Sequence, residues 1–372
     1  MTARTTAAAT PSQSTTTVGV EEEFLLVDAT TRQTAARAAD VLARTPALPA
    51  GAKVDRELLT TQVEFASGVC TDLDELHGQL LAGRRALVAA AGAEGALVVP
   101  SGTPVLAGPV PPLAEGDRFT RISALYGGQV ADYQCCGCHV HVGVPDRDTA
   151  VAVVNHLRPW LPTLLALSVN SPFAAGRDTG FGSWRMVEQA RFPGSGVPPR
   201  FGSAAEHDAA VARLAECGVL VDEAMTFWLA RPSPRYPTVE VRAADAAVTA
   251  ADAVLQAGLT RALVDAALAD LAAGREAPAL DDQVLAAAVW SAARHGLGGP
   301  GVDPWRGVPV PAADLLRRLV EHVSYDGPVW SVVAGGTGAD RQRRAADGGP
   351  VAVVDALAAA CISAPDGGNP RR

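Results

Sequence analysis

The chain has 372 residues, of which 48% are hydrophobic, and a formal net charge of -9 at neutral pH. This length can bury a large core and predicts one catalytic domain or two fused lobes. The negative charge argues against sequence-independent binding to nucleic acid or to an anionic membrane surface. An anionic substrate would therefore need local neutralisation.

Membrane spans and export signals are not expected. The most apolar long stretch, residues 151–173, contains Asn155, His156, Arg158 and three prolines, so it does not resemble a transmembrane helix. Residues 1–17 are mostly Thr, Ala and Ser without the hydrophobic centre of a secretory signal, and we expect a disordered tail there. Six cysteines without an export signal favour a reduced, cytoplasmic protein.

The first predicted strand covers residues 18–27, which read V-G-V-E-E-E-F-L-L-V and are followed by D-A-T. Side chains alternate between the two faces of a strand. Glu21 and Glu23 should therefore share one face, and Glu22 should lie on the other.

The second strand is expected at residues 58–67, where Gln62 and Glu64 would share a face. Leucines at helical spacing then predict a helix over 72–93, with Thr71 or Asp72 as its N-cap. The local order is strand followed by helix.

The middle of the chain offers two more strands and a long loop. A short apolar run covers 96–99, and residues 138–144 read C-H-V-H-V-G-V, which places both histidines on one face. A helix over 148–168 should bend at its two prolines. Residues 171–202 are rich in Gly, Pro and Arg, and so long a polar loop is typical of a functional segment.

The last strand is predicted at residues 237–243, P-T-V-E-V-R-A, with Val239 and Val241 on one side and Glu240 and Arg242 on the other. It follows a predicted helix, and Ala- and Leu-rich segments after it predict further helices. The predicted helices cover residues 204–230, 249–275, 282–295, 312–324 and 351–362.

Four predicted strands thus carry carboxylates or histidines at alternate positions, with mostly apolar residues between them. Any one pair alone would suit a solvated sheet face. If the strands form one antiparallel sheet, the polar residues could line a common surface, where the carboxylates would repel one another unless cations lay between them. Oxygen-rich sites with a histidine suit Mg²⁺ or Mn²⁺. The candidates are Glu21, Glu23, Glu57 or Glu64, His139 or His141, and Glu240.

A zinc site is the alternative for the motif C-C-x-C-H-x-H, formed by Cys135, Cys136, Cys138, His139 and His141. This motif lacks the two-residue gaps that let paired ligands surround one tetrahedral ion. The ordinary interpretation is that the three cysteines are small buried residues beside a strand. The chain contains neither a phosphate-binding G-x-x-x-x-G-K-[ST] loop nor a G-x-S-x-G motif.

Four motifs, in this order, resemble the type 2 glutamate–cysteine ligase family and its YbdK-like carboxylate–amine ligases: V-G-V-E-E-E, E-L-L-T-T-Q-V-E, G-C-H-V-H-V-G-V and Y-P-T-V-E-V-R. The resemblance spans about residues 18–244. It implies an α+β, glutamine-synthetase-like fold, in which a curved antiparallel sheet has helices packed on its convex side and binds ATP and Mg²⁺ or Mn²⁺ in its concavity. It also implies a single catalytic domain over residues 18–362, followed by a flexible end at 363–372.

The resemblance assigns roles to particular residues. Arg242 is similar to the family's phosphate-contacting arginine and, with Glu240, would be catalytic. Arg185 lies where the family places basic substrate contacts, although its surroundings G-S-W-R-M-V-E depart from the commoner pattern. His141 would be a second ligand or a contact to ATP or substrate. The implied metal ligands are Glu21, Glu23, Glu57, Glu64, His139 and Glu240.

The implied activity is an ATP-dependent ligation through an acyl phosphate, with glutamate as the carboxylate and cysteine or another amine as the acceptor. The partners are then small molecules, without nucleic acid or membrane, and the protein could be a homodimer. Two other hypotheses stay open at this point. One is a zinc-dependent hydrolase that uses His139 and His141. The other is a catalytically silent nucleotide-binding relative.

Overall fold

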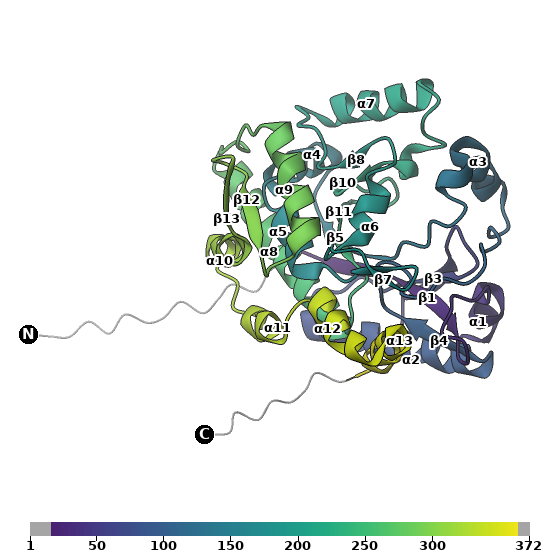
Figure 1. Ribbon diagram of the computed structural model, residues 1–372. Helices are drawn as coiled ribbons and strands as arrows, with labels where there is room; N and C mark the ends of the chain where they lie inside the picture. Colours follow the sequence, from purple (N-terminus) through teal and green to yellow (C-terminus); the bar gives the residue numbers. More distant parts are fainter. Residues whose placement is uncertain (1–15, 364–372) are drawn as a thin grey trace, which may run out of the picture.

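The computed structural model, which describes residues 16–363, is built around one antiparallel sheet (Figure 1). The strand order is β10-β11-β5-β1-β3-β2, and β4 pairs with the C-terminal end of β1. The strands of this sheet are β1 (Val18–Asp28), β2 (Lys53–Arg56), β3 (Gln62–Ala66), β4 (Ala96–Val99), β5 (Gly137–Gly143), β10 (Ala230–Pro232) and β11 (Thr238–Asp245).

The register of the sheet brings its polar residues together. Glu21 of β1 lies opposite His139 of β5, and Glu23 lies opposite Glu64 of β3. His141 of β5 in turn lies opposite Glu240 of β11. Because side chains alternate along each strand, these residues share one face of the sheet.

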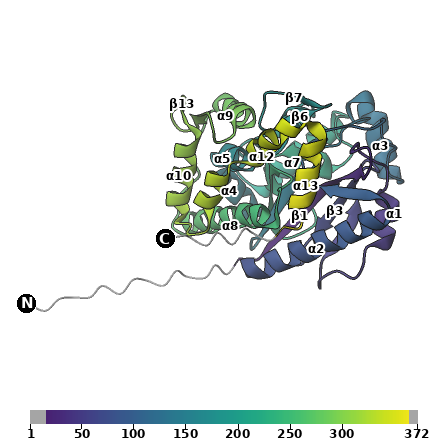
Figure 2. The ribbon, with the colours of Figure 1, turned by 60° about the horizontal axis from the view of Figure 1, so that its bottom comes forward.

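The other face of the sheet is apolar and covered by helices. Val20 and Phe24 of β1, Val140 of β5 and Val241 of β11 are at most 3% exposed, and full burial of such a side chain stabilises the fold by roughly 1.5–3 kcal/mol. Figure 2 shows α2 and α8 lying along this face, and α4 and α5 also pack against it. These helices are α2 (Leu73–Ala93), α4 (Arg147–Leu157), α5 (Leu161–Ser168) and α8 (Ala250–Ala272).

Further helices and short strand pairs surround this core. The outer helices are α1 (Ala38–Arg44), α3 (Asp117–Tyr126), α6 (Trp184–Gln189), α7 (Ala204–Glu216), α9 (Asp282–His295), α10 (Ala312–Val323), α11 (Val329–Gly335), α12 (Gly338–Ala345) and α13 (Pro350–Ala360). The strand pairs are β6 (Phe173–Ala174) with β7 (Arg177–Asp178), β8 (Ser195–Gly196) with β9 (Phe227–Trp228), and β12 (Pro300–Asp303) with β13 (Val308–Pro311).

The predicted antiparallel sheet with helices on its other face is confirmed, and so are several predicted helix boundaries. Asp72 caps α2, because its side chain accepts hydrogen bonds from the backbone N–H groups of Asp74 and Glu75. The helix predicted over 148–168 is divided into α4 and α5, as its prolines indicated. Within residues 16–363, no helix has both the length and the apolar character needed to cross a membrane.

Two predicted segments are wrong. The helix predicted over 204–230 ends at Glu216, because Gly218 adopts a left-handed φ of 73° and the chain then turns into short strands. The strand predicted from Leu58 begins at Gln62, so Glu57 lies in the connection that precedes it. The expected tails lie almost wholly outside the described residues, and the single domain over 18–362 stays a prediction.

Candidate functional site

A cavity of about 210 Å³ lies on the polar face of the sheet. Its walls come from β1, β3, β5, β10 and β11, and from the connections that include α3 and α6. Every predicted site residue lines this one cavity: Glu21, Glu23, Glu57, Glu64, His139, His141, Arg185, Glu240 and Arg242. The roles that the resemblance assigns to them stay predictions.

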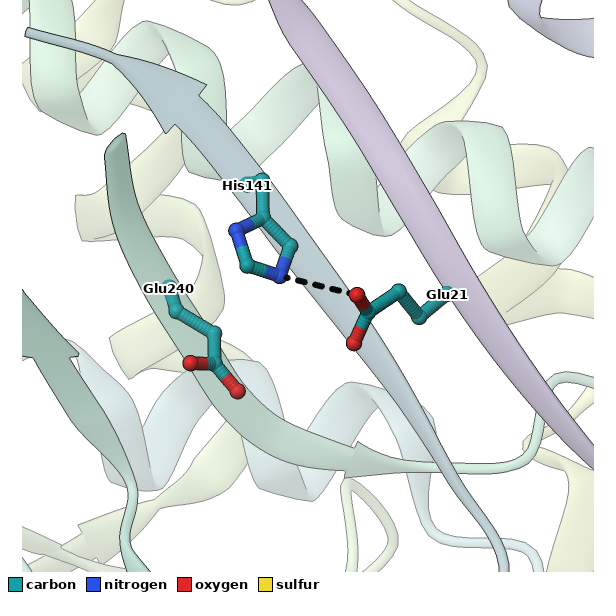
Figure 3. A group of neighbouring side chains, drawn as sticks. All are labelled: Glu21, His141 and Glu240. Atoms are coloured by element: carbon teal, nitrogen blue, oxygen red, sulfur yellow. Dashed lines mark ion pairs between the residues drawn. The ribbon is translucent and has the colours of Figure 1, made fainter. Parts of the chain in front are cut away.

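One set of possible metal donors spans three neighbouring strands. Glu21, His141 and Glu240 each offer a donor atom, and these three atoms lie within 4.8 Å of one another. Figure 3 shows Glu21 and Glu240 on either side of the His141 ring. The Nε2 atom of His141 lies 3.6 Å from Oε1 of Glu21, while its Nδ1 atom lies 2.9 Å from the hydroxyl of Thr238. The hydroxyl thereby fixes the ring with Nε2 toward the acid.

A second set of donors contains only carboxylates. Glu23, Glu57 and Glu64 also bring donor atoms within 4.8 Å of one another. Burial and the neighbouring Glu23 raise the pKa of Glu57 to about 7. Burial, together with the charges of Glu21, Glu57 and Glu23, raises the pKa of Glu64 well above its ordinary value. Burial and the proximity of like charges thus favour the protonated forms of Glu57 and Glu64 unless a cation takes the place of the protons.

His139 lies between the two sets. Its Nδ1 atom is 3.7 Å from Glu21 and its Nε2 atom is 3.8 Å from Glu23. Burial and the charge of Arg242 lower the pKa of His139, which favours the neutral ring that could bind a metal. Among residues 16–363, the buried Nε2 atoms of both His139 and His141 have no hydrogen-bond partner.

These observations fit a hard divalent cation. The two sets together supply five carboxylates and one imidazole, and such oxygen-rich donors suit Mg²⁺ or Mn²⁺. The two buried, unpartnered imidazole nitrogens are also free to serve as metal donors. His141 belongs to a three-donor set, whereas His139, the expected metal-side histidine, belongs to neither.

At the edge of the site, two arginines form ion pairs with Glu240. Arg231 donates to Glu240 through Nε at 2.8 Å and Nη2 at 3.2 Å, and Arg242 donates through Nη1. Burial disfavours ionisation of Glu240, but the charges of Arg231 and Arg242 outweigh it and hold its pKa well below the ordinary value. Glu240 is therefore ionised at neutral pH.

Arg231 is a site residue that the sequence predictions missed. It directly follows the segment expected to be helical, residues 204–230, and begins the text R-P-S-P-R-Y-P, whose prolines exclude a helix there and favour a turn. Its partner lies nine residues later, across the hairpin of β10 and β11. The prolines could have revealed the turn, but the sequence alone does not reveal the pairing.

Arg185 enters the cavity from the long loop, at the second residue of α6. Its side chain is 3% exposed, and Nη2 donates to the carbonyl of Arg242 at 3.2 Å. Within the described chain its Nη1 atom is buried and has no hydrogen-bond partner. A buried guanidinium with unused donors can bind a carboxylate or phosphoryl oxygen.

The alternative zinc site is not formed. Cys138 belongs to the core beneath the sheet, Cys136 belongs to a second apolar cluster, and only Cys135 lines the cavity. Within residues 16–363, no three-donor set includes a cysteine. Burial raises the pKa of Cys135 to about 12, so its thiol keeps its proton. The interpretation of these cysteines as small buried residues is confirmed.

Chemically, the cavity combines cation-binding oxygen donors with guanidinium groups. A divalent cation and arginines on one surface can neutralise a polyphosphate and the charge that develops during phosphoryl transfer. The protein's net charge of -9 does not prevent this, because the acids would hold cations and the cations and arginines would face the anion.

Comparisons with known proteins agree with this chemistry. The model of the family described as "Glutamate-cysteine ligase family 2" matches residues 17–331. A protein of Saccharopolyspora erythraea, provisionally named glutamate–cysteine ligase 2-2, is 55% identical over 362 residues, covering 92% of each chain. A Nocardia farcinica protein, provisionally named glutamate–cysteine ligase 2-1, is 42% identical over 368 residues, covering 95% of this chain and 96% of that one.

Solved structures share the fold at low sequence identity. The glutamate–cysteine ligase of Francisella tularensis, determined in complex with AMP, has a TM-score of 0.65 at 13% identity and is matched over 94% of this chain and 90% of its own. A bifunctional glutathione synthetase from Pasteurella multocida has a TM-score of 0.60 at 15% identity, covering 93% of this chain. The chain spans about half of that bifunctional protein, 52% of its length.

Proposed function

Since this chain belongs to glutamate–cysteine ligase family 2, whose members are ATP-dependent carboxylate–amine ligases, we propose that it joins the γ-carboxylate of glutamate to the amine of cysteine. The observation that carries the proposal is the meeting of two acidic donor sets with Arg185, Arg231 and Arg242 in one cavity. This combination suits a nucleoside triphosphate with its divalent cation and an anionic amino acid.

The proposed cofactor is Mg²⁺ or Mn²⁺ with ATP. Glu21, His141 and Glu240 would hold one cation, and Glu23, Glu57 and Glu64 would hold another, with His139 between them. When bound, the cations would neutralise the phosphate charges and orient the reacting phosphoryl group. Arg242, whose charge is balanced by Glu240, would contact a phosphoryl oxygen at the edge of this cluster.

The reaction follows from the weakness of a carboxylate as an acyl donor. A γ-carboxylate oxygen of glutamate attacks the γ-phosphorus of ATP, ADP leaves, and an acyl phosphate results. The amine nitrogen then attacks the acyl carbon, inorganic phosphate leaves, and the amine loses a proton as the amide forms. The chain's contribution is to position both substrates and stabilise charge, because phosphoryl transfer needs little covalent help.

A substrate screen tests this proposal. ADP release would be measured with glutamate, ATP and Mg²⁺ across amino acids and simple amines, and the amide product would be identified by mass spectrometry. We expect release to depend on both glutamate and an amine, with cysteine the best acceptor. Amine-dependent release with a different acceptor would overturn the cysteine assignment, and hydrolysis of any substrate without ATP would overturn the ligase itself.

Mg²⁺ binding should strengthen as the pH rises from about 6 to about 8. Glu57 has a pKa of about 7 in the folded protein, so below that pH its carboxyl holds a proton that Mg²⁺ must displace. Above that pH the carboxylate is already free. Calorimetric titration with Mg²⁺ at several pH values measures this, and Glu57→Gln should show a shallower dependence. A wild-type affinity that is equal across this range would contradict Glu57 as a ligand.

Gly137→Ala should raise the KM for glutamate or the KM for ATP by about tenfold, because small displacements of groups that position a substrate weaken its productive binding. A Cβ atom at position 137 would lie 2.5 Å from Nη2 of Arg185 and 2.9 Å from Nε2 of His139, so both side chains must move. Gly92→Ala in α2 is the matched control, because nothing lies within 4 Å of its added Cβ. Equal kinetics for the two variants would show that the contact at Gly137 is unimportant.

A further inference from the structure

Asp245, the last residue of β11, reaches the polar face of the sheet through a β-bulge. Val241 pairs with Val140, but Ala244 pairs with Cys138 and Asp245 with Gly137, so β11 contains one extra residue between these pairs. With strict alternation, position 245 would lie on the helix-covered face with Val241. The bulge reverses this alternation and places Asp245 on the same face as Glu240.

The carboxylate of Asp245 joins β11 to the loop that carries Arg185. Its Oδ2 atom accepts hydrogen bonds from the backbone N–H of Asn170 at 2.8 Å and from the hydroxyl of Ser171 at 2.7 Å, and its Oδ1 atom accepts from the hydroxyl of Ser183 at 2.8 Å. Asp245 is fully buried. A buried carboxylate with three donors fixes β11, the segment at residues 170–171 and the segment at Ser183 relative to one another.

Both serines also bind the backbone around Arg185. The Ser171 hydroxyl accepts the backbone N–H of Arg185 at 3.1 Å, and the Ser183 hydroxyl accepts the N–H of Met186 at 3.2 Å as the N-cap of α6. Each serine hydroxyl thus accepts from the first turn of α6 and donates to Asp245. The position of α6, and of the Arg185 backbone, therefore depends on Asp245.

The guanidinium of Arg185 lies near Asp245 but does not form a hydrogen bond with it. Its Nη1 atom lies 3.7 Å from Oδ1 of Asp245, which is beyond hydrogen-bond distance, and among the described residues it has no hydrogen-bond partner. Opposite Asp245 in the sheet, Gly137 leaves the space that the guanidinium fills. The ion pair orients Arg185, which lines the cavity, and leaves Nη1 without a hydrogen-bond partner among the described residues.

We propose that Asp245 is a positioning residue that acts through Ser171 and Ser183 to hold Arg185 in place, so that Nη1 binds an oxyanion of a substrate. The ligand chemistry is a carboxylate or phosphoryl oxygen, which glutamate or ATP would supply. The identity of these two substrates rests on the proposed function. The positioning network itself rests on the contacts of Asp245.

The test is Asp245→Asn, which keeps the size of the side chain but replaces one acceptor oxygen by an amide donor. We expect the KM for glutamate or the KM for ATP to rise by about tenfold or more, the scale of one hydrogen bond to a charged group. A rise for glutamate identifies the oxyanion as a carboxylate, and a rise for ATP identifies a phosphoryl oxygen. Unchanged values of both constants would overturn the proposal.

A double-mutant cycle with Arg185→Met separates positioning from a general loss of structure. If Asp245 acts through Arg185, Asp245→Asn should change neither KM further once Arg185 is replaced. The same rise in both backgrounds would overturn the proposal. Asp303→Asn is the matched control, because Asp303 is also buried and also accepts backbone N–H groups, from Trp305 and Arg306, but does not line the cavity. It should leave both constants unchanged.

Two further experiments cover the cases in which the variant does not fold or the wild-type protein shows no turnover. If Asp245→Asn does not fold, Ser183→Ala removes one of its three hydrogen bonds and should raise the same KM in the wild-type background only. If the wild-type protein releases no ADP with any amine, the proposed function fails, and the same cycle is run by calorimetry with glutamate and with ATP and Mg²⁺. A loss of affinity that requires Arg185 then still supports the positioning role, and equal affinities overturn it.

Discussion

Glu240→Gln should lower amine-dependent ADP release by about 10²- to 10³-fold, the range measured when one preorganised electrostatic contact is removed. Glutamine keeps the volume of Glu240 but removes the carboxylate that completes the set with Glu21 and His141. It also leaves Arg242 without the charge that balances it beside the cavity. Steady-state kinetics with saturating ATP and Mg²⁺ measure the loss.

Glutamine is preferable to alanine at this position. Arg231 is 6% exposed, and removing its partner outright would leave a buried charge without compensation, so Glu240→Ala should also destabilise the fold. Glu22→Gln is the matched control, because Glu22 belongs to a buried ion pair with Arg84 beneath the sheet. It should lose stability and keep turnover within about threefold of wild type, far from the loss expected at the site. Normal turnover in Glu240→Gln would contradict the proposed role of Glu240 as a metal ligand.

The sequence was sufficient to predict the faces of the strands. Alternation separated Glu21 and Glu23 from Glu22, and the structure places the first two in the cavity and the third against α2. This succeeded because each of the main strands has one apolar face that must be buried, and a slip of one residue would bury carboxylates without partners. Periodicity therefore carried the information about the site.

Contacts between distant segments could not be predicted in this way. The pairing of Arg231 with Glu240 needs the register of a hairpin, and nothing in the local residues favours this arginine over Arg235. Asp245 lay beyond the predicted end of the strand at Ala243, and the bulge that turns it toward the site reverses the alternation used for prediction. Such irregularities depend on tertiary packing rather than on local propensity.

Charge alone could not predict how the donor residues of the site are grouped. Repulsion between acids on one face predicted cations, but it could not divide the acids into two sets or decide between the histidines. The structure places His141 in a donor set and His139 between the sets. Glu57 lines the cavity from a connection rather than from a strand, so its position could not come from alternation.

Arg84→Met should lower the free energy of unfolding by about 3–5 kcal/mol, the cost of breaking a buried ion pair by removing one partner. Arg84 and Glu22 have fully buried side chains, joined at 2.5 Å and 3.0 Å. Arg84 also donates to three backbone carbonyls, those of Ala247, Val248 and Cys361, and so links α2 to the segment between β11 and α8 and to the end of α13. Methionine fills similar volume but satisfies none of these acceptors.

The double variant Glu22→Gln with Arg84→Met decides how much of this loss is electrostatic. If the unpaired carboxylate of Glu22 causes most of it, neutralising that residue should restore about half or more of the lost stability, because the charge then no longer lies unpaired in the core. Denaturant unfolding of the wild type, both single variants and the double variant measures the cycle. Purely additive losses would show instead that the arginine stabilises the protein mainly through its three carbonyl contacts, which neutralising Glu22 cannot replace.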